Sequence, residues 1–141
     1  MTRPRPEPRP KLHAGVALSP LACAVYEILR QRIGQADPRI TYKELACLLR
    51  ERDTAFEHVT HRSQELYAAL WEVGDVCRDL VLPPLPALVV RADTRRPGDA
   101  YFAGSPLAHR GERTAAWQRD LDAVCQATYP TTPHLGPPPS V

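Results

Sequence analysis

The 141-residue chain is predicted to form one α+β domain, with three helices, a two-stranded β-ribbon and a further helix. Two observations support this prediction. Apolar residues recur every three or four positions in successive segments of residues 19–80. Residues 82–104 (LPPLPALVVRADTRRPGDAYFAG) then have the pattern of a strand, a basic turn and a second strand. Because this is the order of elements in a winged helix, we predict a winged-helix domain with an extra C-terminal helix.

Proline marks both ends of the chain. Four of the sixteen prolines lie in residues 1–10, and five lie in residues 130–139. Such segments favour extended conformations and do not form a packed core. The predicted parts are a disordered basic arm (residues 1–18), the winged-helix domain (residues 19–104), a link with the C-terminal helix (residues 105–129) and a disordered tail (residues 130–141).

The surplus positive charge lies in the arm. The net charge is +2, and residues 1–18 hold four basic residues and one acid, whereas residues 19–104 hold eleven basic and twelve acidic residues. Such an arm suits contact with phosphate or with an acidic protein, and the alternative is a solvated tail. We expect a cytoplasmic protein with no membrane partner, because no apolar run suits a signal peptide or the roughly 20-residue span of a bilayer.

Capping residues mark the first two helices. Ser19 followed by Pro20 suits a helix start, because serine accepts from free backbone amides and proline fits the first helical position. Residues 41–44 (TYKE) have the form of a capping box, in which Glu44 reaches back to the Thr41 amide.

A third helix is predicted after a polar stretch. Residues 51–62 are expected to form a long turn or one extra helical turn. Ser63 then caps a helix whose apolar residues recur in steps of four and three between Leu66 and Leu80. Gly74 within this pattern indicates close packing against another helix.

The ribbon and a last helix complete the prediction. Residues 87–90 (ALVV) favour a strand, residues 93–98 a turn, and residues 100–102 (AYF) the return strand. Thr114 is expected to open the last helix, in which Trp117 either completes the core or mediates a homodimer.

Three motifs in residues 25–104 occur in the order found in a known family. They are residues 25–29 (VYEIL), residues 40–46 (ITYKELA), and residues 89–93 (VVRAD) followed by residues 101–104 (YFAG). Together they resemble the C-terminal winged-helix domain of alkylguanine-DNA alkyltransferases and their alkyltransferase-like relatives. In that domain the corresponding motifs form the first helix, the entry to the second helix and the segment after the reactive site.

One departure from this family bears on chemistry. The alkyltransferases carry a Pro-Cys-His-Arg run before the strand, and its cysteine thiolate accepts the alkyl group. The corresponding residues here are Pro86, Ala87 and Leu88, without a cysteine nucleophile or an adjacent histidine to activate one. The resemblance therefore implies a shared winged-helix architecture without alkyl transfer. We predict a non-enzymatic protein with no cofactor.

A winged helix predicts a surface for double-stranded DNA. Its third helix enters the major groove and its ribbon lies on the backbone, so we expect a small DNA-binding regulator. Arginine and a helix N-terminus suit phosphate, and glutamine suits a base edge. The alternative is that these side chains are ordinary solvated turn residues. The predicted contacts are Lys43 on the second helix, Arg62, Ser63, Gln64 and Tyr67 at the start of the third, and Arg91, Arg95 and Arg96 on the wing.

The rest of the third helix favours another class of function. Trp71 lies among four acidic residues, which would repel phosphate, so it is either a protein contact or packed under the last helix. The alternative function is therefore a protein-binding module that acts as an inhibitor or adaptor, such as a mobile element carries. The four acids are Glu65, Glu72, Asp75 and Asp79.

Cysteine and histidine predict neither disulfides nor a metal site. The four cysteines form no C-x-x-C pair and fall within predicted helices, so we expect small buried residues in a reduced protein. His58 and His61 would approach each other on a helix but lack a third ligand. The cysteines are Cys23, Cys47, Cys77 and Cys125.

Overall fold

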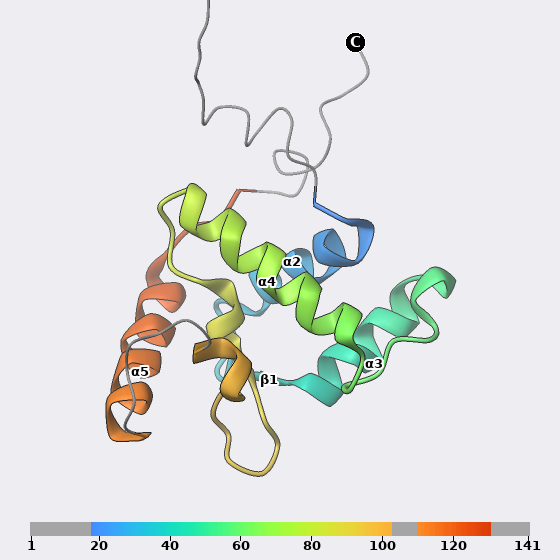
Figure 1. The fold of residues 1–141 in the computed structure, drawn as a ribbon. Coiled ribbons are helices and arrows are strands. Elements are labelled where there is room, and N and C mark those ends of the chain that lie inside the picture. Colours follow the sequence, from blue (N-terminus) through green and yellow to red (C-terminus); the bar gives the residue numbers. More distant parts are fainter. Residues whose placement is uncertain (1–17, 103–109, 131–141) are drawn as a thin grey trace, which may run out of the picture.

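The computed structural model describes residues 18–102 and 110–130. These residues form an α+β fold of helices and one small sheet (Figure 1). Most of the predicted arm and tail, and residues 103–109 of the predicted link, lie outside the described residues. The elements are α2 (Pro20–Arg32), β1 (Ile40–Thr41), α3 (Tyr42–Arg52), the 3-10 helix η1 (Thr54–Phe56), α4 (Gln64–Asp79), η2 (Leu85–Leu88), β2 (Val89–Val90), η3 (Asp99–Phe102) and α5 (Arg110–Gln126).

The core lies where α2, α4 and η2 meet. In Figure 1, α4 crosses in front of α2, α3 lies on one side of this pair, and α5 lies on the other. The short η2 contacts α2, α4 and α5, so the apolar segment that precedes β2 joins all three helices. Tyr26, Leu66 and Leu88 are among the fully buried side chains that these elements contribute.

The predicted β-ribbon is wrong. Val89 and Val90 pair in parallel with Ile40 and Thr41, and the predicted return strand is the 3-10 helix η3. The physical reason lies in the burial of residues 85–90, where every side chain except that of Pro86 is buried. An exposed wing strand alternates between apolar and polar side chains, whereas a run buried on both faces is typical of parallel pairing. The winged-helix order therefore holds only in its helices.

The predicted helix starts at Ser19 and Thr41 are confirmed. The Ser19 hydroxyl accepts from the Ala22 amide at 3.2 Å. The Glu44 amide donates to Thr41 Oγ1 at 3.0 Å, and the Thr41 amide donates to Glu44 Oε1 at 2.9 Å, which completes the capping box. The expected extra turn between the second and third helices is also present, as η1.

Three details of the later helices differ from the prediction. The Ser63 hydroxyl accepts from the Thr60 amide at 2.9 Å and makes no cap for α4. Helix α5 begins at Arg110, before the predicted Thr114. The neighbour that Gly74 meets is Pro86 of η2 rather than a residue of an α-helix.

Trp117 and the cysteines divide between core and surface. Trp117 is 4% exposed, and its indole Nε1–H donates to the Ala87 carbonyl at 2.8 Å, so it completes the core rather than presenting a dimer surface. Cys77 is buried, but Cys47 and Cys125 are exposed and Cys23 is half-buried, so the expectation of four buried cysteines is wrong. Both exposed cysteines lie on the solvent side of their helices, where packing does not require them.

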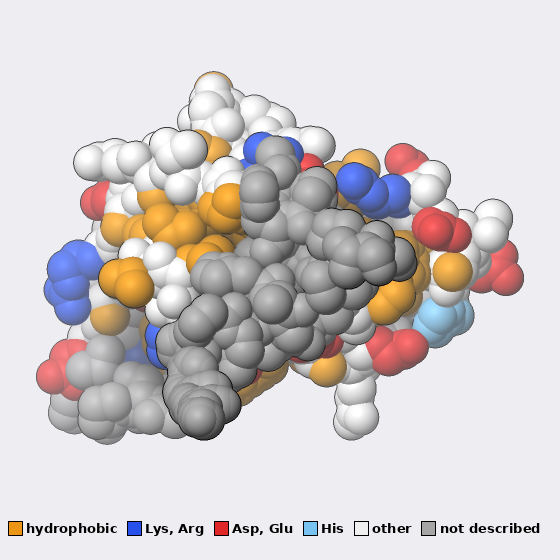
Figure 2. Space-filling view, turned by 90° about the horizontal axis from the view of Figure 1, so that it is seen from above, with side chains coloured by type: hydrophobic (Ala, Val, Ile, Leu, Met, Phe, Trp, Pro, Cys, Tyr) orange, Lys and Arg blue, Asp and Glu red, His pale blue; other side chains and the backbone are white. Residues whose placement is uncertain are grey.

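The outer surface carries mixed charge. Seen from above, hydrophobic side chains gather on one part of the face, while basic and acidic side chains are interspersed around its edge (Figure 2). None of the helices in the described part of the chain combines the length and the apolar character needed to span a membrane.

Candidate nucleic-acid interface

A cleft of about 640 Å³ lies where the starts of α3 and α4 meet the loop that follows β2. We call it the basic cleft. Its walls come from three segments that are far apart in the sequence, because the parallel β1–β2 pair places the loop after β2 beside the start of α3. The lining residues are Thr41, Tyr42, Lys43, His61, Arg62, Tyr67, Arg91, Ala92, Asp93 and Gly98.

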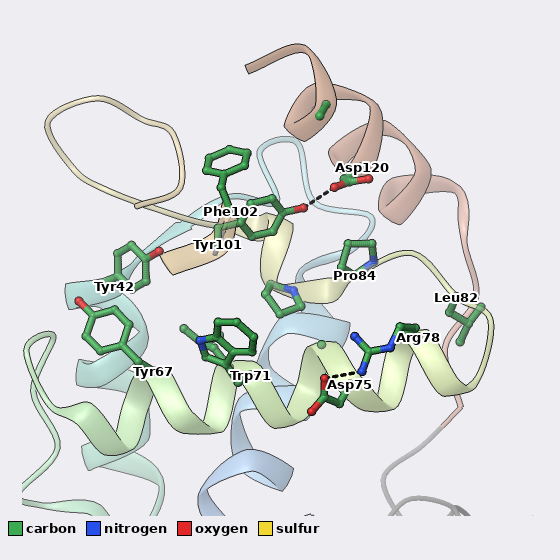
Figure 3. Close-up of a pocket in the computed structure, with 14 residues that line it drawn as sticks. Tyr42, Tyr67, Trp71, Asp75, Arg78, Leu82, Pro84, Tyr101, Phe102 and Asp120 are labelled. Carbon is green, nitrogen blue, oxygen red and sulfur yellow. Dashed lines mark hydrogen bonds and ion pairs between the residues drawn. The ribbon is translucent and has the colours of Figure 1, made fainter. Parts of the chain in front are cut away.

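Tyr42 fastens the three walls together. Its hydroxyl accepts from the Gly98 amide at 3.1 Å, which ties the loop after β2 to α3. Its ring lies beside Tyr67 of α4, with 5.6 Å between the centroids (Figure 3). Burial raises the pKa of Tyr42, so its hydroxyl stays protonated at neutral pH. The walls of the cleft are therefore held by specific contacts.

Among the described residues, the cleft carries the side chains of two arginines and one lysine against one carboxylate. The exposed side chains of Lys43 and Arg62 make no ion pair with any described residue. Arg91 donates to Asp93 at 2.9 Å, and these hydrogen bonds lower the pKa of Asp93. Both partners are more than half exposed. A surface pair of this kind costs little to open, so the Arg91 guanidinium can turn to an anion in the cleft.

Four of the eight predicted DNA contacts line this cleft: Lys43, Arg62, Tyr67 and Arg91. Ser63 and Gln64 follow Arg62 directly at the start of α4, where Gln64 is exposed. The structure thus brings together residues of the second and third helices with one arginine from the predicted wing.

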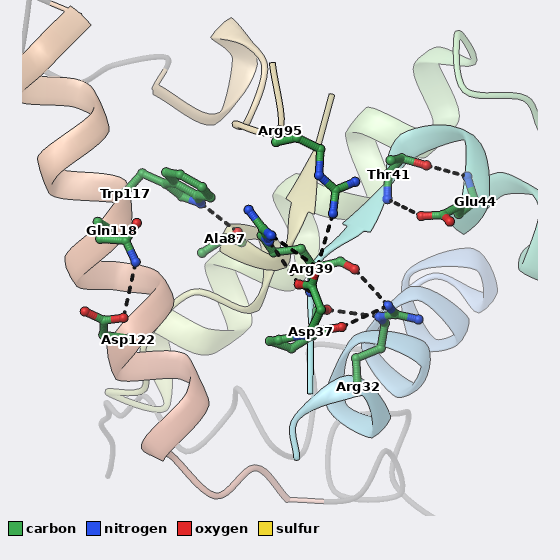
Figure 4. A network of polar contacts seen from close by, with 11 residues as sticks. Arg32, Asp37, Arg39, Thr41, Glu44, Ala87, Arg95, Trp117, Gln118 and Asp122 are labelled. Carbon is green, nitrogen blue, oxygen red and sulfur yellow. Dashed lines mark hydrogen bonds and ion pairs between the residues drawn. The ribbon is translucent and has the colours of Figure 1, made fainter. Parts of the chain in front are cut away.

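Arg95 and Arg96 point to other partners instead. Arg95 Nη2 lies 3.3 Å from Asp37 Oδ2, and Arg96 Nη1 lies 3.4 Å from Thr114 Oγ1 of α5. Figure 4 shows Arg95 directed at Asp37, on the side of the β1–β2 pair where Arg39 also lies. Neither arginine is in the basic cleft, so the structure does not place these two predicted contacts with the other six.

Asp37 lies at the centre of a cluster of three arginines, Arg32, Arg39 and Arg95, outside the basic cleft. Arg39 Nε donates to it at 2.9 Å, and the hydrogen bonds from Arg39 lower the pKa of Asp37 to about 2. Arg32 donates to the carbonyls of Pro38 and Arg39, at 3.0 Å and 2.8 Å. The cluster anchors the loop after β2, because Arg95 reaches across to it from a left-handed conformation with φ 58°.

Sequence reasoning missed six of the ten residues given above for the cleft, among them Tyr42 and His61. Tyr42 stands in the predicted capping box, but its contact with Gly98 spans 56 positions and leaves no local signal. His61 lies in the turn before α4 and directly precedes Arg62, and its place beside a predicted contact is the signal that could have identified it.

The acids of α4 do not face the basic cleft. Glu72 accepts from the Ser19 amide at 3.0 Å and from its hydroxyl at 2.9 Å, and so lies toward α2. Glu65 lies 2.8 Å from His58, and Asp75 lies 2.7 Å from Arg78. None of the four acids, including Asp79, lines the cleft, and Glu65 is the one that stands in the first turn of α4.

A second concavity, of about 470 Å³, lies along α4 between η2, η3 and α5. We call it the aromatic groove. Trp71, half exposed, stands on its α4 wall, and Ala116 and Asp120 come from α5 (Figure 3). The Tyr101 hydroxyl donates to Asp120 at 2.6 Å. Trp71 therefore faces the last helix across an open groove and is not packed beneath it.

The two histidines that the sequence singled out, His58 and His61, lie in turns rather than on a helix. Within the described ranges no three histidine, cysteine or acidic residues gather as metal ligands.

When the chain was compared with known proteins, no family model, curated protein or solved structure matched it. The resemblance to alkyltransferase domains stays a prediction.

Proposed function

We propose that the protein is a small, non-enzymatic DNA-binding regulator that holds the phosphate backbone of duplex DNA in the basic cleft. One observation carries this proposal: Lys43 and Arg62 line the same cleft without ionic partners among the described residues, and Arg62 stands just before the uncapped start of α4. Free backbone amides at a helix N-terminus and unpaired cations together favour phosphate oxygens. Arg91 supplies a third cation from the opposite wall.

The same geometry gives α4 a direction on the duplex. Phosphate contacts set register and orientation, and base edges supply sequence information. The exposed Gln64 stands at the first position of α4, directly after Arg62 and Ser63. A phosphate held at Arg62 would therefore bring Gln64 to the edge of a groove, where an amide pairs with adenine.

The test is the salt dependence of duplex binding. Fluorescence anisotropy with a random-sequence duplex, at several salt concentrations, gives the slope of log affinity against log salt. Removing two phosphate contacts in Lys43→Ala/Arg62→Ala is expected to lower that slope by about 2. A matched control, Arg52→Ala/Arg119→Ala, removes the same charge from exposed positions outside the cleft and should change the slope far less.

Two results would overturn the proposal. One is a lack of binding even at low salt, where the electrostatic attraction is strongest. The other is an equal change of slope in the cleft variant and in the control, which would show that only total charge matters. The first result would favour the alternative predicted from the sequence, a protein-binding module, which the half-exposed Trp71 in the aromatic groove supports.

A further inference from the structure

The aromatic groove has the chemistry of a binding site for a proline-rich segment. Five of the nine aromatic residues of the chain line it, together with Pro84 and Pro86. Trp71 is 50% exposed, although the burial of a tryptophan is strongly favourable. Grooves walled by aromatic rings recognise the polyproline II conformation, which is extended before binding and so loses little entropy on docking.

The chain itself contains a matching segment. Prolines occupy every second position from residue 4 to residue 10 and alternate with Arg5, Glu7 and Arg9. Residues 1–17 lie outside the described part of the chain. This segment is joined to the domain at Leu18, which is buried, and at Ser19, which is hydrogen-bonded to Glu72 of α4. Glu72 is the neighbour of Trp71 in that helix, so the arm leaves the domain beside the groove's own helix.

The arm is long enough to cover the whole groove. At about 3.1 Å per residue, a polyproline II segment of this length spans roughly 50 Å. Helix α4, which forms one entire wall, has 16 residues and a length of about 24 Å. Crossing the width of one helix, about 10 Å, uses only the few residues next to Leu18. The prolines at residues 4–10 therefore reach every part of the groove.

Charge distinguishes the arm from the tail. The charged residues that line the groove within the described part of the chain are Asp75, Asp120 and Arg78, an excess of one negative charge. Residues 1–17 hold four basic residues and one acid, whereas residues 131–141 hold no lysine or arginine. Both segments contain prolines, but only the arm complements the two carboxylates.

We propose that residues 1–17 fold back and occupy the aromatic groove of the same molecule, with prolines against Trp71 and arginines near Asp75 and Asp120. Tethering makes even weak docking effective, because a short linker gives an effective concentration of the order of millimolar. This proposal does not depend on DNA binding, since Tyr42 and Tyr67 are the only described residues that the basic cleft and the groove share.

The two tryptophans make the test direct. Each indole N–H gives one signal in a ¹⁵N–¹H correlation spectrum, and Trp71→Phe identifies which is which. The Trp71 signal is expected to differ between the full chain and a variant that lacks residues 2–17, whereas the buried Trp117 signal stays in place. A synthetic peptide of residues 1–17, added to the shortened protein, should return the Trp71 signal toward its full-chain position.

Full-length variants separate proline recognition from charge and from the tail. Replacing the four prolines of residues 4–10 by alanine keeps length and charge, and should move the Trp71 signal to its position in the shortened protein. The matched control replaces the four prolines of residues 133–139 and should leave the signal unchanged. The proposal is overturned if deletion leaves the Trp71 signal in place, if only the tail variant moves it, or if its position depends on protein concentration.

Discussion

Replacing Trp117 by phenylalanine is expected to destabilise the protein by about 3 kcal/mol. The indole N–H hydrogen bond to the Ala87 carbonyl is lost, and this carbonyl belongs to a residue with no exposed surface. Leaving such a group without a partner costs about 1–3 kcal/mol. The smaller phenylalanine ring also removes buried apolar surface, at about 0.8 kcal/mol for each group the size of a methylene.

The assays are urea unfolding and thermal unfolding, both followed by circular dichroism, which does not depend on the tryptophans as fluorophores. A loss of about 3 kcal/mol corresponds to a fall in Tm of roughly 10 °C for a domain of this size. Trp71→Phe is the matched control, because the same replacement at a half-exposed position should change stability by less than about 0.5 kcal/mol.

The reasoning is refuted if the two tryptophan variants have equal stability. That result would mean that α5 does not share the core with η2. An intermediate result, in which Trp117→Phe costs less than about 1 kcal/mol, would mean that the Ala87 carbonyl finds another donor.

Three further predictions concern a helix cap, cysteine reactivity and pH. Thr41→Ala removes the capping box and should cost about 1–2 kcal/mol in urea unfolding, whereas Thr41→Ser should retain most of the stability. In the folded protein Cys47 is exposed and should react with a disulfide reagent. Cys77 should react only on unfolding, because it is buried and burial raises the pKa of its thiol to about 11. Equal reaction rates of the two thiols in the folded protein would contradict this prediction. The pKa of Asp37 is lowered from 3.8 to about 2, so its carboxylate stabilises the folded state at neutral pH, and this contribution is lost as the pH falls toward 2. The difference in unfolding free energy from Asp37→Asn should therefore be constant above pH 5 and shrink in acid, and it should stay below about 1 kcal/mol because the side chain is 48% exposed.

The helical part of the fold was predictable because its signals are local. The start of α2 at Ser19 and Pro20 and the capping box at Thr41 each depend on contacts within three or four residues. The partner of β2 was not predictable in this way. Val89 pairs with Ile40, and nothing in the local sequence distinguishes that partner from the nearer residues 100–102. The unbroken apolar run at residues 87–90 (ALVV) was the available signal against a ribbon, since a ribbon strand with one solvent face alternates between apolar and polar residues.

The candidate site was predicted in part for the same reason. Lys43 and Arg62 were found from their positions at helix starts, which are local features. The position of the loop after β2 was not predicted correctly, because the pairing of β2 with β1 determines which arginines face the cleft. With β2 beside β1, Arg91 faces the start of α3, while Arg95 turns to Asp37 on the other side. Under the proposed function, the contact surface is therefore this cleft between helix starts rather than a wing.

The most direct test of this cleft is a ¹⁵N–¹H titration of the full chain with a short duplex. The account predicts that the largest changes in amide signals fall at Lys43, His61, Arg62 and Arg91, on the three walls of the basic cleft. Changes confined to the loop around Arg95, with the cleft amides unmoved, would contradict the account and restore the wing as the contact surface.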